Sequence, residues 1–362
     1  MKLKWVVNVP LLPNELISSW LTRAALTQGC DPLVLTGKVF GKWRILTIDA
    51  DRLHGDEKIL PLSDISGNSI EIFEQASLFP VASKIHGSTP PEAIWPWILA
   101  IGARNTKRSG GLQFCPCCLI EDSRPYYRQQ WRFAWHTTCE KHRCSLLDRC
   151  SSCNAPIEPH RLEANNRVLS VCASCKLDLS QSVSQVISKY ALDFQMMADL
   201  VVLDGTGEFQ GQMLSVNEWF KLLDFFCSMI RRANRSPSVL MRDFLSRFSV
   251  GTLSNLPIVS GAGVELLRTH ERIALFEVIY PLVAASKSLF EASTFQSGMT
   301  RQAFCSQEKT LPSVFSELYN LLPDNSKKRG KSIKRDKSKP RPRHEVMRMM
   351  AKLQRNLEMA ER

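Results

Sequence analysis

Apolar residues recur at three- and four-residue spacing along much of the chain, which is the pattern of amphipathic helices. Residues 14–28 predict such a helix, with Asn14 able to cap its start and Gly29 able to end it. Asp31 and Pro32 predict the start of a second helix, because Asp is a common N-cap and Pro is favoured at the first helical position. Together these elements predict a helix-turn-helix-like unit, although any helical hairpin shows the same pattern.

Three more helices are expected before residue 110. Residues 59–65 and 69–77 each carry apolar residues at helical spacing, with a Gly-containing turn between them. Residues 94–101 predict an aromatic-rich helix that includes Trp95 and Trp97. Tryptophans this close together are more typical of a buried core than of a platform on which bases stack.

The C-terminal half predicts a helical domain. Four segments show helical spacing of apolar residues: 185–203, 215–233, 238–248 and 264–280. Glycines near residues 205 and 261–263 indicate breaks between them. The longest apolar stretch, residues 273–285, contains Glu277 and Pro281 and is shorter than the ~20 residues of a membrane span. We therefore expect no membrane-spanning segment.

The formal charge of +12 is concentrated near the C-terminus. Residues 327–343 carry a net charge of +9 and residues 1–326 only +2. We expect this basic segment to be disordered when free, because it has almost nothing apolar to bury. It is the candidate nucleic-acid contact, through Lys327, Lys328, Arg329, Lys331, Lys334, Arg335, Lys337, Lys339, Arg341 and Arg343. An amphipathic helix is expected over residues 344–362.

Nine of the twelve cysteines lie from Cys115 to Cys175, mostly in pairs with two residues between their members. This clustering in a long chain is typical of metal sites in a reducing compartment, and it predicts a cytoplasmic protein. We predict two structural zinc ions, each held by two pairs in sequence. Their ligands are Cys115, Cys118, Cys139 and His142 for the first, and Cys150, Cys153, Cys172 and Cys175 for the second.

Some details of ligation stay open on the sequence alone. Cys117 could replace Cys115 in a shifted turn, and Cys144, His136 and His160 are spare candidates. The first and third pairs could also share one ion, but sequential pairing closes shorter loops. Four protein ligands leave no position for an activated water, which predicts structural rather than catalytic metals.

Basic and aromatic residues alternate between the first two cysteine pairs, over residues 126–135. Such a pattern suits nucleic acid, but Tyr127, Trp131 and Trp135 are spaced four apart and would pack on one face of a helix. On that interpretation Arg128 and Arg132 form a second face that is available to a partner.

Several of these motifs resemble the TniQ family. The similar residues are Leu16 to Arg23, Phe114 to Leu119, Glu121-Asp122, Pro125 to Arg128, Trp131-Arg132, Trp135, Cys139, His142, Leu146, Cys150 and Cys153. The resemblance implies a protein that selects the insertion site of a transposon and links target DNA to an AAA+ ATPase of the TniB or TnsC type and a DDE transposase. It also implies that the DNA is recognised directly or through a CRISPR Cascade complex with guide RNA, that the chain forms homodimers in some members, and that it acts at the bacterial nucleoid.

The predicted fold is mainly α, with five parts. These are an N-terminal helix-turn-helix-like domain (1–110), a tandem zinc-finger region (111–180), a helical domain (181–325), a basic linker (326–343) and a terminal helix (344–362). The sequence holds neither a P-loop nor a zinc-protease motif, and we expect no enzymatic activity. The alternative function is a zinc-containing, sequence-specific transcription regulator.

Overall fold

The computed structural model describes residues 5–41, 44–101, 111–166, 168–235, 238–248, 263–305 and 307–324, and single positions from 343 to 353. Its contacts divide the chain into two compact units, Met1–Pro323 and Asp324–Arg362. The structure is mainly helical, as predicted, and its described residues hold two short antiparallel strand pairs. The boundaries between the five predicted parts stay predictions.

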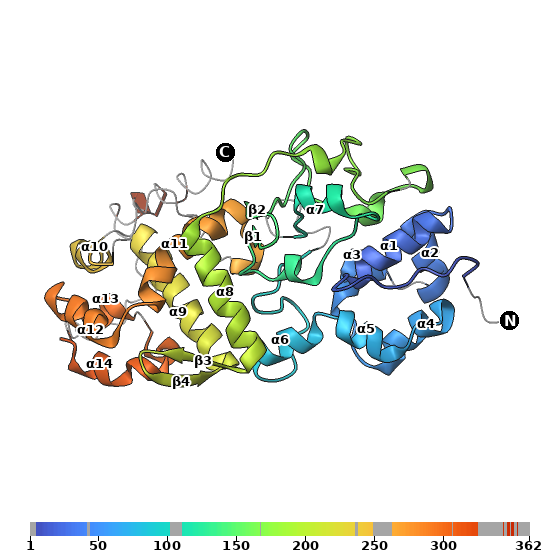
Figure 1. Ribbon diagram of the computed structural model, residues 1–362. Coiled ribbons are helices and arrows are strands. Elements are labelled where there is room, and N and C mark those ends of the chain that lie inside the picture. The colour runs from blue at the N-terminus through green and yellow to red at the C-terminus, as the bar shows by residue number, and fades with distance from the viewer. Residues whose placement is uncertain are drawn as a thin grey trace. The chain divides into compact units, whose positions relative to one another are not determined.

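The N-terminal part of the first unit is a group of short helices, drawn in blue in Figure 1. They are α1 (Ile17–Thr27), α2 (Pro32–Phe40), α3 (Ile45–Ile48), the 3₁₀ turn η1 (Ala50–Arg52), α4 (Asp56–Ser66), α5 (Ile70–Ala76) and α6 (Phe79–His86). The first two begin and end near the predicted positions: Asp31 is the N-cap of α2 and Pro32 its first residue, while Gly29 lies at φ 72° after α1. A helix-turn-helix that binds DNA stays a prediction.

Helix α1 forms the centre of this group and is buried on most of its circumference. Trp20 and Leu21 are fully buried, and the Trp20 indole Nε1 donates to the carbonyl of Val9 at 2.7 Å. The buried Arg23 pairs with the buried Glu15 at 2.6 Å, so neither charge lies unpaired in the core.

The predicted helix over residues 94–101 is wrong. The described residues of this segment are irregular, and Trp97 has φ 60°. Pro96 explains the difference, because it lacks a backbone N–H and disfavours helical geometry at the preceding residue. Both tryptophans are nevertheless buried, as expected, with Trp95 4% exposed and Trp97 0%.

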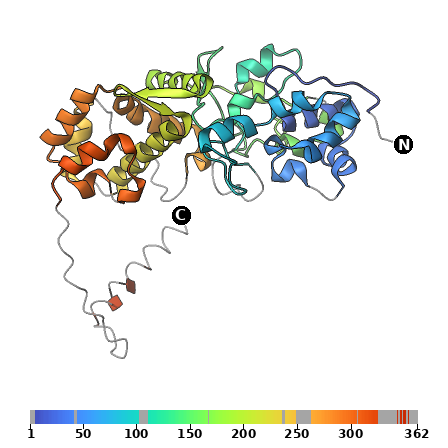
Figure 2. The same ribbon diagram turned by 90° about the horizontal axis from the view of Figure 1, so that it is seen from below.

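The cysteine-rich region has little regular structure. Its elements are α7 (Pro116–Glu121), η3 (Gln129–Arg132), β1 (Thr138–Cys139), β2 (Cys144–Ser145), η4 (Pro159–Arg161), η5 (Ala164–Asn166) and η6 (Leu179–Gln181). It lies between the N-terminal helices and the C-terminal helices of the first unit in both Figure 1 and Figure 2. Tyr127, Trp131 and Trp135 are buried as expected, but only the single turn η3 forms among them.

The C-terminal part of the first unit contains the four predicted helices. The elements are α8 (Lys189–Asp204), β3 (Thr206–Phe209), β4 (Gln212–Ser215), α9 (Val216–Arg235), α10 (Val239–Ser246), η8 (Val264–Leu266), α11 (Thr269–Val283), α12 (Lys287–Gln296), α13 (Arg301–Phe304), η9 (Glu308–Thr310), η10 (Ser313–Phe315) and α14 (Ser316–Leu321). The β3–β4 hairpin was not predicted. Its turn residues Gln210 and Gly211 have φ 52° and 81°, the pair of positive values that a tight hairpin turn requires.

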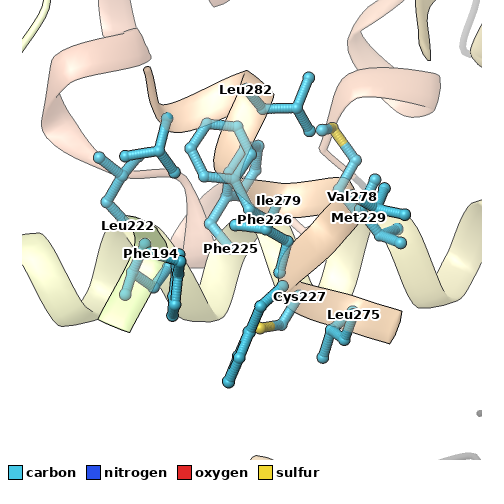
Figure 3. Packing of buried hydrophobic residues seen from close by; sticks show 14 of the residues in the cluster. Phe194, Leu222, Phe225, Phe226, Cys227, Met229, Leu275, Val278, Ile279 and Leu282 are labelled. Carbon is cyan, nitrogen blue, oxygen red and sulfur yellow. The ribbon is translucent and has the colours of Figure 1, made fainter. Parts of the chain in front are cut away.

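An aromatic core joins these helices (Figure 3). Phe194 on α8 stacks on Phe276 of α11 with ring centroids 4.3 Å apart, and Phe226 on α9 belongs to the same buried cluster. Among the described residues no single helix has the length and hydropathy of a membrane span. Helices α11 and α12 have that length and hydropathy only when they are taken together, and the chain bends by 103° between them.

Most of the predicted basic segment and terminal helix lies outside the described residues. Within the second unit, Val346, Met347, Met349, Met350 and Leu353 are helical and exposed. The predicted helix over residues 344–362 stays a prediction.

Candidate metal centres

The structure brings Cys115, Cys118, Cys139 and His142 together. One donor atom from each lies within 4.8 Å of the others. The Nδ1 atom of His142 is 3.4 Å from Sγ of Cys115, 3.3 Å from Sγ of Cys118 and 3.5 Å from Sγ of Cys139. We call this group centre 1.

A second group consists of Cys150, Cys153, Cys172 and Cys175, whose sulfurs also lie within 4.8 Å of one another. The Cys150 and Cys175 sulfurs are 3.5 Å apart, and those of Cys153 and Cys172 are 3.7 Å apart. We call this group centre 2. The pairs are therefore grouped in sequence, and the interleaved arrangement is not observed.

These separations fit tetrahedral zinc. With a Zn–S distance of ~2.3 Å and a Zn–N distance of ~2.0 Å, tetrahedral angles place two sulfurs roughly 3.8 Å apart and a sulfur and a nitrogen roughly 3.5 Å apart. The Cys118–Cys139 distance of 3.7 Å and the three His142 distances lie close to these values. Both centres can thus hold a four-coordinate ion. The identity of that ion stays a prediction.

Three of the four ligand pairs share one backbone turn. In each, the residue four positions after the first cysteine has a positive φ: Arg143 at 50°, Asn154 at 55° and Lys176 at 65°. Each of these residues donates its backbone N–H to the carbonyl of that first cysteine, at 2.8, 3.0 and 2.9 Å. This turn aims both side chains of the pair at one point, which explains the two-residue spacing.

The Cys115–Cys118 pair is built differently, at the start of α7. Cys115 is the N-cap and Pro116 the first helical residue, and Leu119 donates its N–H to the Cys115 carbonyl at 3.2 Å. One helical turn then carries Cys118 back toward Cys115. Both sulfurs are buried, with Cys115 0% and Cys118 3% exposed.

A carboxylate lies behind the histidine of centre 1. The Nε2 atom of His142 is 2.9 Å from Oε1 of Glu121, while Nδ1 faces the sulfurs. Glu121 also contacts the Lys141 ammonium, and its hydrogen bonds to Lys141 and His142 lower the pKa of its carboxyl group. Such a carboxylate fixes the ring orientation of a metal-bound histidine.

The spare ligand candidates belong to neither four-residue group. Cys117 and Cys144 form a third group with Cys115. His136 lies with Glu140 and Asp199, but its Nε2 is only 2.7 Å from the Asp199 carboxylate, which is a hydrogen-bond distance. Burial lowers the pKa of His160 to about 4. Within the described parts of the chain, His160 belongs to none of these groups.

The exposed arginine face predicted at Arg128 and Arg132 is wrong. Arg132 is 0% exposed and donates to Asp49 and Asp51, each at 2.7 Å. Arg128 pairs with Asp122 at 2.8 Å, and its guanidinium lies over the rings of Tyr126 and Trp131. The sequence pattern failed here because the partners of Arg132 are some eighty positions earlier in the chain.

The predicted nucleic-acid residues of the basic segment lie outside the described residues, from Lys327 to Arg341. Arg343 is described as helical and exposed. DNA contact by this segment stays a prediction.

A comparison with known families matches residues 6–146 to the TniQ family. The matched segment of the chain is similar to TniQ. The matched segment spans α1 to the β1–β2 pair, so it includes all of centre 1 and ends before the first ligand of centre 2. No curated protein matches the chain. The TniQ domain supports a transposon-associated role in target selection, and TniQ is known as a non-catalytic adaptor domain.

Proposed function

We propose that this chain is a non-catalytic adaptor that selects the target site of a transposon. It would link target DNA to an AAA+ ATPase and, through that ATPase, to a DDE transposase. The match of residues 6–146 to TniQ is the observation that carries the proposal. The two four-ligand centres support it, because a filled tetrahedral site stabilises a fold and leaves no open position for chemistry.

We propose that both centres hold structural zinc, which joins the TniQ domain to the rest of the first unit. The segment between the ligand pairs of centre 2 touches the N-terminal helices. The Asp31 carboxylate at the start of α2 accepts the backbone N–H of Ala164 at 2.7 Å. The buried Tyr127 hydroxyl donates to the carbonyl of Leu169 at 3.2 Å. Loss of the ion at centre 2 would release both contacts.

We propose that the basic segment contacts duplex DNA directly. Its net charge of +9 over residues 327–343 is far above that of the preceding chain. Several phosphate contacts by such a segment make binding strongly salt-dependent. Recognition through a Cascade complex is the other route to a target, and it would leave a guide RNA bound to the purified assembly.

The test is metal analysis of the purified full-length chain, combined with its recovery from cells that also express the neighbouring transposon genes. We expect two zinc ions per chain and a co-purifying AAA+ ATPase. Co-purified guide RNA would identify the Cascade route, and tight binding of a defined duplex without it would identify direct recognition. Two zinc ions with tight duplex binding but no bound ATPase would overturn the adaptor proposal in favour of a transcription regulator.

The adaptor function can be separated from folding by one further measurement. In a transposition assay with mapped insertions, omission of this chain should abolish insertion at the selected site. Unchanged insertion sites in its absence would contradict the proposal, whatever the metal content.

A further inference from the structure

Two cysteines outside the four-residue centres lie beside centre 1. The sulfurs of Cys115, Cys117 and Cys144 are all within 4.8 Å of one another, and those of Cys115 and Cys144 are 3.6 Å apart. Cys115 is buried, whereas Cys117 and Cys144 are half-buried. The three cysteines therefore extend from centre 1 toward the protein surface.

The backbone explains why the two extra thiols meet. In the β1–β2 pair, Cys144 lies directly opposite Cys139, a ligand of centre 1. Cys117 follows Cys115 by two residues in the first turn of α7. The hairpin and the helix that converge to form centre 1 thus each bring a second cysteine to the same place.

We propose that Cys115, Cys117 and Cys144 form a third metal site, which binds a thiophilic divalent ion such as Zn²⁺ or Cd²⁺. The Cys115 sulfur bridges this ion and the ion of centre 1. The inference rests on the proposed zinc at centre 1. Three protein ligands leave one coordination position of the third ion open, so this ion exchanges more readily than the two structural ions.

The donor set favours this assignment. Soft thiolate ligands select thiophilic ions over Mg²⁺ or Ca²⁺, which prefer oxygen. The Cys115–Cys144 separation of 3.6 Å is close to the roughly 3.8 Å that two sulfurs on one tetrahedral zinc adopt. With two divalent ions, the five thiolates of the combined cluster are left with a formal charge of only −1. A single ion would leave more uncompensated negative charge if all five were ionised.

A disulfide between Cys117 and Cys144 is the competing fate of this pair. It would form by oxidation of both thiols, for example by a small-molecule disulfide that is reduced to two thiols. Half-buried neighbouring thiols are accessible to such an oxidant. The experiment therefore runs under a phosphine reductant, and a thiol count accompanies it.

The test is a cadmium titration of the full-length, zinc-loaded chain, followed by native mass spectrometry and cadmium–thiolate absorption. We expect the wild-type chain to accept one ion beyond two. The C117S/C144S double variant should hold two ions and accept no third. Cys30→Ser is the matched control, since Cys30 is a half-buried cysteine outside the trio. This variant should still accept one ion beyond two, as the wild type does.

Three results would overturn the proposal. A wild-type chain that saturates at two ions with its thiols free has no third site, and a third ion retained by C117S/C144S lies elsewhere. A Cys117–Cys144 disulfide that persists under the reductant would assign the pair to redox chemistry instead. A wild-type chain with fewer than two ions before the titration would show that the structural zinc proposal itself has failed.

Discussion

Arg272 on α11 donates from its guanidinium to the side-chain oxygen of Gln113 at 2.7 Å, and both residues are completely buried. The same guanidinium donates to the carbonyls of Ala134 and His136, and its Nε donates to the carbonyl of Leu267. None of these hydrogen-bond acceptors is a carboxylate. Burial lowers the pKa of Arg272 to about 10. This cation joins the C-terminal helices to the cysteine-rich region through hydrogen bonds to neutral oxygens.

Arg272→Met should lower the free energy of unfolding by about 3 kcal/mol or more, because several buried carbonyls lose their donors. Denaturant unfolding measures the loss. Arg247→Met is the control, since Arg247 pairs with Asp243 near the surface, and it should cost less than about 1 kcal/mol. Equal effects of the two changes would show that the buried hydrogen bonds contribute little.

Substitution of the fully buried Arg132 should lower the free energy of unfolding more than substitution of the half-buried Arg128. Arg132→Lys keeps the charge but cannot bind Asp49 and Asp51 together, so we expect a loss of about 2–4 kcal/mol. Arg128→Lys acts on a half-buried pair with Asp122 and should cost about 1 kcal/mol or less. Thermal unfolding of both variants checks the order, and a larger shift at Arg128 would contradict it.

Cys172→Ser should reduce the metal content from two ions to one and loosen residues 150–180. A structural zinc contributes on the order of 10 kcal/mol to folding such a segment, and a serine does not replace the thiolate. Metal analysis and limited proteolysis measure the two effects. Cys30→Ser should retain both ions and the wild-type cleavage pattern. Full metal content in Cys172→Ser would remove this residue from centre 2.

Asp224 should make stability depend on pH. Burial, and then the nearby Glu265 carboxylate, raise the pKa of Asp224 from its ordinary value of 3.8 to about 7. The folded state therefore holds a proton that the unfolded state has lost between these two values, and stability falls as pH rises from about 4 to about 7. In the Asp224→Asn variant the new side chain is neutral at every pH. Its amide oxygen can still accept the Trp97 indole N–H, which reaches Asp224 at 3.1 Å.

The measurement is the difference in unfolding free energy between Asp224→Asn and the wild type. As pH rises from about 4 to about 7, this difference should shift in favour of the variant. The shift should be smaller than the value of about 1.4 kcal/mol per pH unit for a fully buried group, because part of the Asp224 side chain is exposed to solvent, and it should level off above about pH 7. Taking the difference cancels the loss of metal that acid causes in both proteins. A difference that stays constant from about pH 5 to about pH 8 would refute the raised pKa.

Deletion of residues 327–362 should weaken DNA binding and flatten its salt dependence, because it removes ten lysines and arginines of the basic segment. The metal content should remain at two ions per chain, since all eight ligands precede the deletion. Binding titrations at several salt concentrations test this. Undiminished affinity of the truncated chain would place DNA contact elsewhere.

Much of the helical fold was predictable from local patterns. The helices α8 to α11 follow the three- and four-residue spacing of their apolar positions, and α2 starts at Asp31-Pro32 as its capping residues indicate. The grouping of the metal-ligand pairs also follows from sequence, because a two-residue spacer is a local geometric constraint.

The predictions that the structure contradicts, and the hairpin that was not predicted, have two causes. Either the partners of a side chain lie far away in the sequence, or a local proline or turn signal was overlooked. Arg132 is buried because Asp49 and Asp51 come from a distant part of the chain, which no local pattern around Arg132 reveals. Pro96 and the Gln210-Gly211 turn, in contrast, are local features that could have predicted the irregular Trp95–Trp97 segment and the β3–β4 hairpin.

The positions of the ligands along the chain bear on how the protein matures during synthesis. Centre 1 is complete at His142 and centre 2 at Cys175, whereas Arg272 emerges from the ribosome about a hundred residues later. Both centres can therefore capture metal while translation continues. The strained turns at Arg143, Asn154 and Lys176 would then already be locked when α11 arrives. Metal supply during translation, rather than after it, would decide how much of the newly made protein reaches its final fold.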